Sequence, residues 1–143
     1  MNNKKIVLAS GYFNPFHVGH LEYLELAKKC GDKLIVIINN DEQVKLKGSA
    51  PFMNQEDRMK IIQALKCVDE VFLSIDKDAS VCQSIEFLAK TKGANVFAKG
   101  GDRNTTNIPE KQVCDRLKIE RIDGLGAKIR ASSELIKNSQ QIK

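Results

Sequence analysis

Short apolar runs alternate with longer amphipathic stretches along the chain, and this alternation constrains the fold more than any other feature. The runs predict buried strands, and the longer stretches predict helices because their apolar residues recur at helical spacing. The predicted strands are Lys5–Ala9, Leu34–Ile38, Glu70–Leu73, Asn95–Ala98 and Ile119–Ile122. The predicted helices are His17–Cys30, Asn54–Lys66, Ser80–Lys92, Pro109–Leu117 and a last helix capped by Ser132 or Ser133.

Strands that alternate with helices form mostly parallel sheets through right-handed crossovers. We therefore predict an α/β fold, a single domain over residues 1–143 with a Rossmann-like, doubly wound parallel sheet of five strands in the order 3-2-1-4-5. In such sheets ligands bind beyond the carboxyl ends of the strands, where the strand order switches. The loops after the first, second, fourth and fifth strands are therefore the places to look for a site.

Local signals predict several helix ends. Asn54 is a good N-cap, and Asp57 three residues later resembles the acidic partner of a capping box. Gly31 and Gly93 directly follow predicted helices, where glycine commonly ends a helix.

The composition excludes several classes of protein. With 42% hydrophobic and 29% charged residues, it is typical of a soluble globular domain. No apolar run approaches the length of a membrane span, and no signal peptide is evident, so we expect a cytoplasmic protein with no membrane partner. The net charge of +5 is spread along the chain and aromatic residues are few, which disfavours a nucleic-acid surface and suits anionic small molecules. Four cysteines without a C-x-x-C pair indicate reduced thiols rather than a zinc cluster.

The strongest chemical signal is His17-Val18-Gly19-His20, which contains the only two histidines of the chain. At the start of a helix, residues three apart share a face with free backbone N–H groups and the positive end of the helix dipole. These groups can converge on one phosphate, Gly19 leaves room for it, and Gly11 allows a tight turn and a close ligand. A helix cap beside a packed histidine, or a metal site, are the alternatives.

The segment Gly11-Tyr12-Phe13-Asn14-Pro15-Phe16-His17-Val18-Gly19-His20 resembles the signature of the H-x-G-H nucleotidyltransferases. Further motifs of that family follow in the expected order, namely Lys47-Gly48, Asn54–Met59, Ala64–Asp69 and Lys99–Asp102. Within that family, the chain resembles the adenylyltransferase domain of ADP-heptose synthases, and it is similar to glycerol-3-phosphate cytidylyltransferase. The resemblance implies transfer of a nucleoside monophosphate from ATP or CTP to a phosphorylated sugar or polyol, with release of pyrophosphate. It also implies Mg²⁺ carried with the nucleotide, no metal held by protein ligands alone, and a homodimer.

The resemblance assigns roles to individual residues. His17 and His20 would stabilise charge on the α-phosphate, and Lys47 and Arg58 would hold the outer phosphates as the other catalytic residues. The nucleotide-binding residues would be Gly11, Tyr12, Phe13, Asn14, Gly19, Lys99, Gly100, Gly101, Asp102, Ser132 and Ser133.

The residue types in these loops suit such roles. Lys45 and Lys47 share a face if the loop after the second strand is extended, so that both could meet a triphosphate. Arg58 can grip a phosphate bidentately, or can instead form a surface ion pair with Glu56 or Asp57.

The loops after the fourth and fifth strands also contain residue types that suit a nucleotide site. The glycines of Lys99–Asp102 let the backbone approach a base or ribose, and Asp102 could accept a bond from a ribose hydroxyl. Ser132 and Ser133 at a helix start form an anion nest, unless they serve only as caps.

Three residues depart from the family pattern, and they leave the acceptor open. Asn14 replaces the usual Asp of sugar and alcohol enzymes, Arg103 replaces an aromatic residue, and Ala131 replaces a hydroxyl; Lys128 or Arg130 could supply a basic residue of the family. A nicotinamide- or pantetheine-type adenylyltransferase is a further enzyme alternative, prompted by Asn14. A non-catalytic nucleotide sensor with the same fold is the alternative from another class, and it would bind a nucleotide without releasing pyrophosphate.

Overall fold

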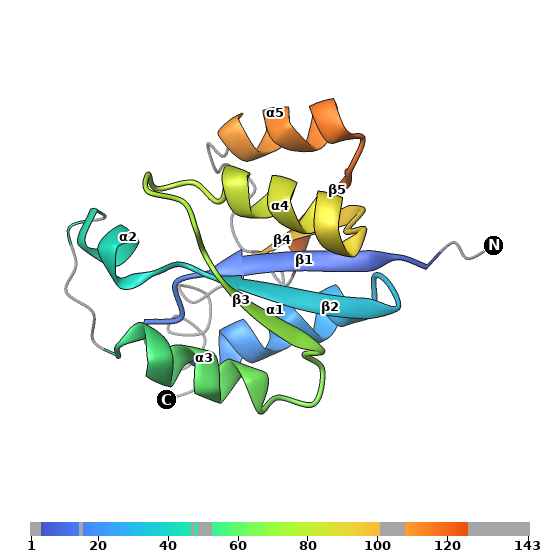
Figure 1. The fold of residues 1–143 in the computed structure, drawn as a ribbon. Coiled ribbons are helices and arrows are strands. Elements are labelled where there is room, and N and C mark those ends of the chain that lie inside the picture. Colours follow the sequence, from blue (N-terminus) through green and yellow to red (C-terminus); the bar gives the residue numbers. More distant parts are fainter. Residues whose placement is uncertain (1–3, 15, 47, 49–52, 101–107, 126–143) are drawn as a thin grey trace, which may run out of the picture.

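A computed structural model of the chain describes residues 4–14, 16–46, 48, 53–100 and 108–125. These residues form a five-stranded sheet with helices on both faces (Figure 1). The strands are β1 (Ile6–Gly11), β2 (Lys33–Ile38), β3 (Glu70–Leu73), β4 (Val96–Gly100) and β5 (Glu120–Leu125). The helices are α1 (Val18–Lys28), α2 (Asp41–Leu46), α3 (Gln55–Gln63), α4 (Cys82–Lys92) and α5 (Ile108–Leu117).

The strand order is β3-β2-β1-β4-β5 and every neighbouring pair is parallel, which confirms the predicted α/β class, sheet type and order. The central strand β1 pairs with β2 along its whole length, from Ile6 to Gly11. Its pairing with β4 is limited to Val7 and Leu8. The sheet therefore opens between β1 and β4 toward their carboxyl ends, at the switch in strand order where ligands bind in such folds.

Two apolar clusters cover the two faces of the sheet, because successive side chains of a strand point to opposite faces. On one face, β1 and β2 pack against α1 and α3; on the other, they pack against α4 and α5 (Figure 1). Each residue from Leu34 to Ile38 has no exposed surface, as predicted for a strand covered on both sides. The carboxyl ends of β1 and β2 are thus held rigidly, and the loops that follow them start from fixed points.

A buried tyrosine spans the opening between β1 and β4. The hydroxyl of Tyr23 on α1 donates to the carbonyl of Ala98 at 2.6 Å and accepts from the backbone N–H of Ser10 at 3.2 Å. Both partners lie beyond the last paired residues of the two strands. Burial raises the pKa of the Tyr23 phenol, so the hydroxyl keeps its proton. One side chain therefore replaces the backbone bonds that the separated strands do not make.

Several predicted helix ends are confirmed. Asn54 caps α3, and its Oδ1 accepts from the backbone N–H of Asp57 at 2.8 Å. Gly93 ends α4 in the left-handed conformation, with φ of 75°. The predicted helix Asn54–Lys66 was too long, because α3 ends at Gln63.

The prediction that Gly31 terminates the first helix was wrong. Helix α1 ends at Lys28, and its C-cap Lys29 keeps a right-handed helical backbone. Gly31 serves a different purpose, because a Cβ atom there would lie 2.6 Å from Val7 Cγ2 and 2.7 Å from the carbonyl oxygen of Lys5. A glycine is required at Gly31 by this close approach to β1 rather than by its backbone angles.

Helix α2 was missed, since the segment after β2 was predicted to be a loop. Asn40 and Gln43 form a reciprocal cap: Asn40 Oδ1 accepts from the Gln43 N–H at 2.9 Å, and Gln43 Oε1 accepts from the Asn40 N–H at 3.0 Å. This is the geometry of a capping box, and the spacing Asn-x-x-Gln was a signal present in the sequence. Lys45 consequently lies on a helix, so the extended-strand argument that paired it with Lys47 does not apply to it.

The last predicted helix, with Ser132 and Ser133, lies outside the described residues. Within residues 4–125, gaps aside, no helix is long and apolar enough to cross a bilayer.

Replacing Tyr23 by Phe tests the role of its hydroxyl in the sheet. The change leaves a half-buried N–H at Ser10 and a buried carbonyl at Ala98 without their shared partner, so we expect the free energy of unfolding to fall by about 1–3 kcal/mol. Urea denaturation followed by circular dichroism measures the loss. A change within error of zero would show that the hydroxyl does not hold the two strands.

Candidate active site

The loop between β1 and α1 turns sharply at its start. Phe13 has φ of 52°, a left-handed conformation that is uncommon for an aromatic residue, and its ring is buried. The ring packs directly over Gly11, where a Cβ atom would lie only 2.7 Å from Phe13 Cζ. Gly11 is therefore required by the position of Phe13, in addition to any ligand that approaches the backbone.

The two histidines cap α1 together. The Nδ1 atom of His17, the N-cap residue, accepts from the Gly19 N–H at 3.1 Å, and the Nδ1 atom of His20 accepts from the His17 N–H at 3.1 Å. An Nδ1 atom that accepts a hydrogen bond carries no proton, so each neutral imidazole has its proton on Nε2. Capping and ligand binding, which the sequence analysis treated as alternatives, are thus compatible, because capping leaves an Nε2–H donor on each ring.

Aromatic packing fixes the two imidazole rings. His17 and His20 are stacked with centroids 3.8 Å apart, and Phe13 meets His20 edge-on at 5.0 Å. Burial, and secondarily the charge of His17, lower the pKa of His20 to about 4. His20 is therefore neutral at pH 7 and acts as a hydrogen-bond donor rather than as a cation.

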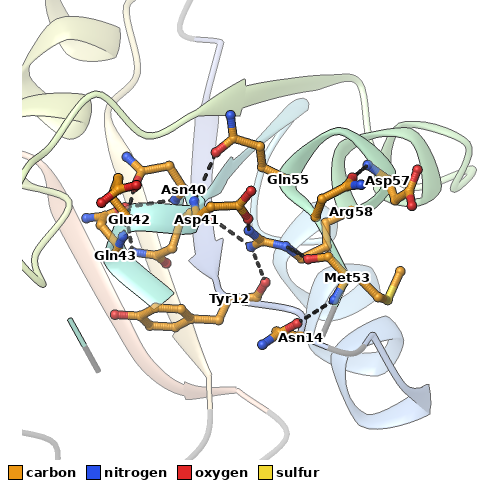
Figure 2. Close-up of polar contacts among 12 residues, drawn as sticks. Tyr12, Asn14, Asn40, Asp41, Glu42, Gln43, Met53, Gln55, Asp57 and Arg58 are labelled. Carbon is orange, nitrogen blue, oxygen red and sulfur yellow. Dashed lines mark hydrogen bonds and ion pairs between the residues drawn. The ribbon is translucent and has the colours of Figure 1, made fainter. Parts of the chain in front are cut away.

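Arg58 of α3 is buried and bonds to several separate segments of the chain. It forms neither the phosphate grip nor the surface ion pair that were predicted from the sequence. It donates through Nε to the Met53 carbonyl at 2.9 Å, and through Nη1 to the carbonyls of Tyr12 and Asn39, each at 2.7 Å. Its Nη2 atom pairs with Asp41 Oδ1 at 2.7 Å, rather than with a carboxylate of its own helix (Figure 2). The side chain has no exposed surface, so a phosphate cannot reach it in this conformation.

Two further bonds tie the start of α3 to the neighbouring loops (Figure 2). Asn14 Oδ1 accepts from the Met53 N–H at 2.9 Å, and Gln55 Oε1 accepts from the Asp41 N–H at 2.9 Å. Asn14, which departs from the family pattern, thus connects the loop between β1 and α1 (the histidine loop, residues 12–17) to the start of α3.

A cavity of about 540 Å³ lies beyond the carboxyl ends of β2 and β3. It is lined by Asn40, Glu42, Lys45, Leu46, Ile75, Asp76 and Lys77. The two walls are joined, because Asn40 Nδ2 donates to the carbonyls of Ser74 and Asp76. This cavity was not predicted from the sequence, because the loop after the third strand was not among the expected site loops. The signal for it is Lys77, a basic residue in that loop.

The cations of the cavity differ in their surroundings. Lys45 pairs with Glu42 at 3.5 Å, whereas Lys77 forms no ion pair with any residue that the structure describes. The Asp76 carboxylate is occupied by the amino end of α4, where it accepts from the backbone N–H groups of Gln83 and Ser84. Lys77 is therefore the side chain best able to meet an anion in this cavity.

The structure brings together most of the predicted residues that it describes. The β1–α1 loop and the ends of the two elements that it joins contain Gly11, Tyr12, Phe13, Asn14, Gly19 and both histidines, and Lys99 and Gly100 end the adjacent strand β4. The other predicted site residues lie outside the described part of the chain, namely Lys47, Gly101, Asp102, Ser132 and Ser133, together with Arg103, Lys128, Arg130 and Ala131. Within the described part, no three His, Cys, Asp or Glu residues are grouped as a metal would require.

A protein-family model described as cytidylyltransferase-like matches residues 8–131. The chain belongs to the cytidylyltransferase-like family. Members of this family are nucleotidyltransferases, so the enzyme class inferred from the paired histidines is confirmed.

Individual curated proteins are also similar to this chain in sequence. The chain is 36% identical to an FAD synthase of Pyrococcus abyssi over 98% of its own length and 96% of that protein. It is 38% identical to the bifunctional protein HldE of Aliarcobacter butzleri, and this match covers 85% of the chain and 25% of HldE. The chain thus spans about a quarter of the HldE protein but almost the whole FAD synthase.

A solved structure agrees in fold. The lipopolysaccharide core biosynthesis protein of Thermoplasma volcanium superposes with a TM-score of 0.68, at 24% identity, over 85% of this chain and 95% of that one. At this identity the similarity concerns the fold alone.

Replacing His17 by Ala tests whether this residue donates to a phosphate in addition to capping α1. We expect kcat to fall roughly 10²–10³-fold if its Nε2–H meets a phosphate, and stability to fall by about 1 kcal/mol because the N-cap is lost. His17→Asn is the matched control, since Asn is a good N-cap but has no Nε2–H. It should restore stability and leave kcat low; recovery of kcat in this variant would show that His17 acts only as a cap.

The ionisation of His20 can be followed directly, because the chain has only two histidines. We expect an NMR titration midpoint near pH 4 for His20, and a midpoint near its ordinary value of 6.5 would contradict the burial seen here. The unfolded chain binds the proton more readily than the folded one. The contribution of His20 to stability is therefore complete above pH 6.5 and is lost as the pH falls from about 6.5 toward 4.

Proposed function

We propose that the chain is an adenylyltransferase that transfers AMP from ATP to a phosphorylated sugar and releases pyrophosphate. The observation that carries this proposal is the pair of stacked, mutually capping imidazoles at the start of α1, each with its proton on Nε2. Two donors beside the free N–H groups of a helix start suit a phosphate that gains charge during transfer.

The proposed reaction is a direct in-line displacement. An oxygen of the acceptor phosphate attacks the α-phosphorus of ATP and forms the new P–O bond. The bond between the α-phosphorus and the bridging oxygen breaks, and pyrophosphate leaves with the electron pair. The attacking phosphate is already an anion at neutral pH, so no general base is needed and the protein acts through positioning and charge stabilisation.

The roles of the other residues remain part of the proposal. His17 and His20 donate to oxygens of the α-phosphate through their Nε2–H groups, and Lys47 holds the outer phosphates. Gly100, Gly101 and Asp102 receive the base and ribose, and Ser132 and Ser133 receive the leaving pyrophosphate. Mg²⁺ enters with the nucleotide, because phosphate oxygens and water can supply most of its octahedral ligands.

The acceptor is proposed to occupy the cavity beyond β2 and β3. Its lining combines the cation of Lys77 with the exposed apolar side chains of Leu46 and Ile75, a mixture that suits a phosphate attached to a larger body. The cavity is joined to the histidine loop through Asp41 of α2 and Arg58, so the acceptor and nucleotide sides share one framework.

One of the relatives suggests flavin mononucleotide as a second candidate acceptor. The relative from Pyrococcus abyssi is called an FAD synthase, and it matches this chain over nearly the full length of both. Flavin mononucleotide is itself a phosphate monoester, so joining AMP to it is the same displacement at the same phosphorus. Both candidate reactions use ATP, which is why a cytidylyltransferase is the less favoured alternative.

Pyrophosphate release with each of the four nucleoside triphosphates should identify the reaction. We expect turnover with ATP and a sugar phosphate, and a kcat that is roughly 10²–10³-fold lower in the His20→Ala variant. The acceptor panel should also contain flavin mononucleotide, glycerol 3-phosphate and nicotinamide mononucleotide, with the joined product identified by mass spectrometry. Lys77→Ala should raise KM for the acceptor but not for ATP, and Lys60→Ala, which removes an exposed lysine from α3, is its control.

The outcomes of this experiment distinguish the alternatives. Turnover of ATP with flavin mononucleotide alone would select the second acceptor, and turnover with CTP would select the cytidylyltransferase. Tight nucleotide binding without pyrophosphate release on any acceptor would overturn the proposal in favour of a sensor.

A further inference from the structure

Phe13 is held in its left-handed conformation from both sides. The carbonyl of the preceding residue, Tyr12, accepts from Arg58 Nη1 at 2.7 Å. The side chain of the following residue, Asn14, accepts from the N–H of Met53, whose carbonyl accepts from Arg58 Nε. Figure 2 shows both connections leading from the histidine loop to the guanidinium or to its immediate partner.

Such support is needed, because a bulky residue does not adopt this backbone region by preference. Non-glycine residues in sparsely populated regions persist only where the surrounding structure over-determines them. The ring that the strained backbone places over Gly11 is the same ring that meets His20 edge-on at 5.0 Å. The Phe13 ring thus links the His20 imidazole to a backbone segment that is bonded to Arg58 on one side and through Asn14 on the other.

We propose that Arg58 is a positioning residue for nucleotidyl transfer: it holds the Phe13 backbone, and through the Phe13 ring it fixes the imidazole of His20. This inference rests on the proposed function for its kinetic consequence. It differs from the phosphate-binding role that the sequence suggested for Arg58, because the guanidinium is buried and its bonds go to protein groups.

The bonding pattern needs the planar fork of an arginine. Three carbonyls and one carboxylate accept from three different nitrogens of the group. A lysine supplies one charged nitrogen, which can keep the ion pair with Asp41 but cannot replace the fork. Arg58→Lys therefore preserves the buried charge and removes the grip on the loop.

The test compares kinetics with the imidazole signals of the nucleotide-free protein. We expect Arg58→Lys to lower kcat about 10²-fold, the effect of a displacement of about 1 Å in a catalytic group. KM for the nucleotide should stay within about threefold of the wild type, because no phosphate contact is lost. The ¹⁵N and ¹H signals of His20 should shift, and His17→Asn assigns them because only two histidines are present.

A second core variant separates positioning from general destabilisation. Leu88→Ala removes a fully buried side chain from the cluster on the opposite face of the sheet. At a matched loss of unfolding free energy it should leave kcat and the His20 signals unchanged. If Arg58→Lys does not fold, Asn14→Ala removes the other hold on Phe13 and should shift the His20 signals in the free protein.

Two results would overturn the proposal. One is an Arg58→Lys protein, or in its place Asn14→Ala, whose His20 signals match the wild type. The other is an Arg58→Lys protein with a raised KM for the nucleotide at unchanged kcat, which would indicate a direct phosphate contact. If the wild type releases no pyrophosphate with any acceptor, the proposed function fails, and the imidazole spectra still decide whether Arg58 positions His20.

Discussion

A buried positive charge must be matched on every side, and Arg58 imposes this requirement on the surrounding structure. Its side chain has no exposed surface, and protein oxygens converge on the guanidinium from several parts of the chain. They come from the loop after β1, from the end of β2, from α2 and from the segment before α3. Segments far apart in the sequence are thereby brought to one edge of the sheet, next to the histidines.

The sequence predicted the framework well because the framework depends on local patterns. The unbroken apolar run Leu34–Ile38 indicated a strand covered on both faces, and all five residues are buried. Asn54 and Gly93 mark helix ends through bonds and angles that involve only nearby residues. Helix α2 was missed although its Asn-x-x-Gln cap is also local, because its segment was interpreted as a basic loop that contains Lys45 and Lys47.

The environment of Arg58 could not be predicted in the same way. Along the chain its neighbours are Glu56 and Asp57, which suggest a surface ion pair. Its actual partners include two main-chain carbonyls at the ends of separate strands. Every residue has such a carbonyl, so the residue types in the sequence do not indicate which ones Arg58 contacts. Likewise, the spacing of His17 and His20 indicated a shared face, but which nitrogen of each ring carries the proton follows only from the bonds within the fold.

The hydroxyl of Tyr23 makes the spacing of β1 and β4 depend on one side chain, and this affects how the fold can change during evolution. Because one side chain spans the gap between β1 and β4, the separation of the two strands beyond Leu8 and Phe97 is set by a single residue rather than by backbone hydrogen bonds. A mutation at this one codon, with compensation in the surrounding core, therefore changes that separation while β1 keeps its full pairing with β2. The edge of the sheet at which ligands bind in folds of this kind can thus change shape while the central strand pair stays in place.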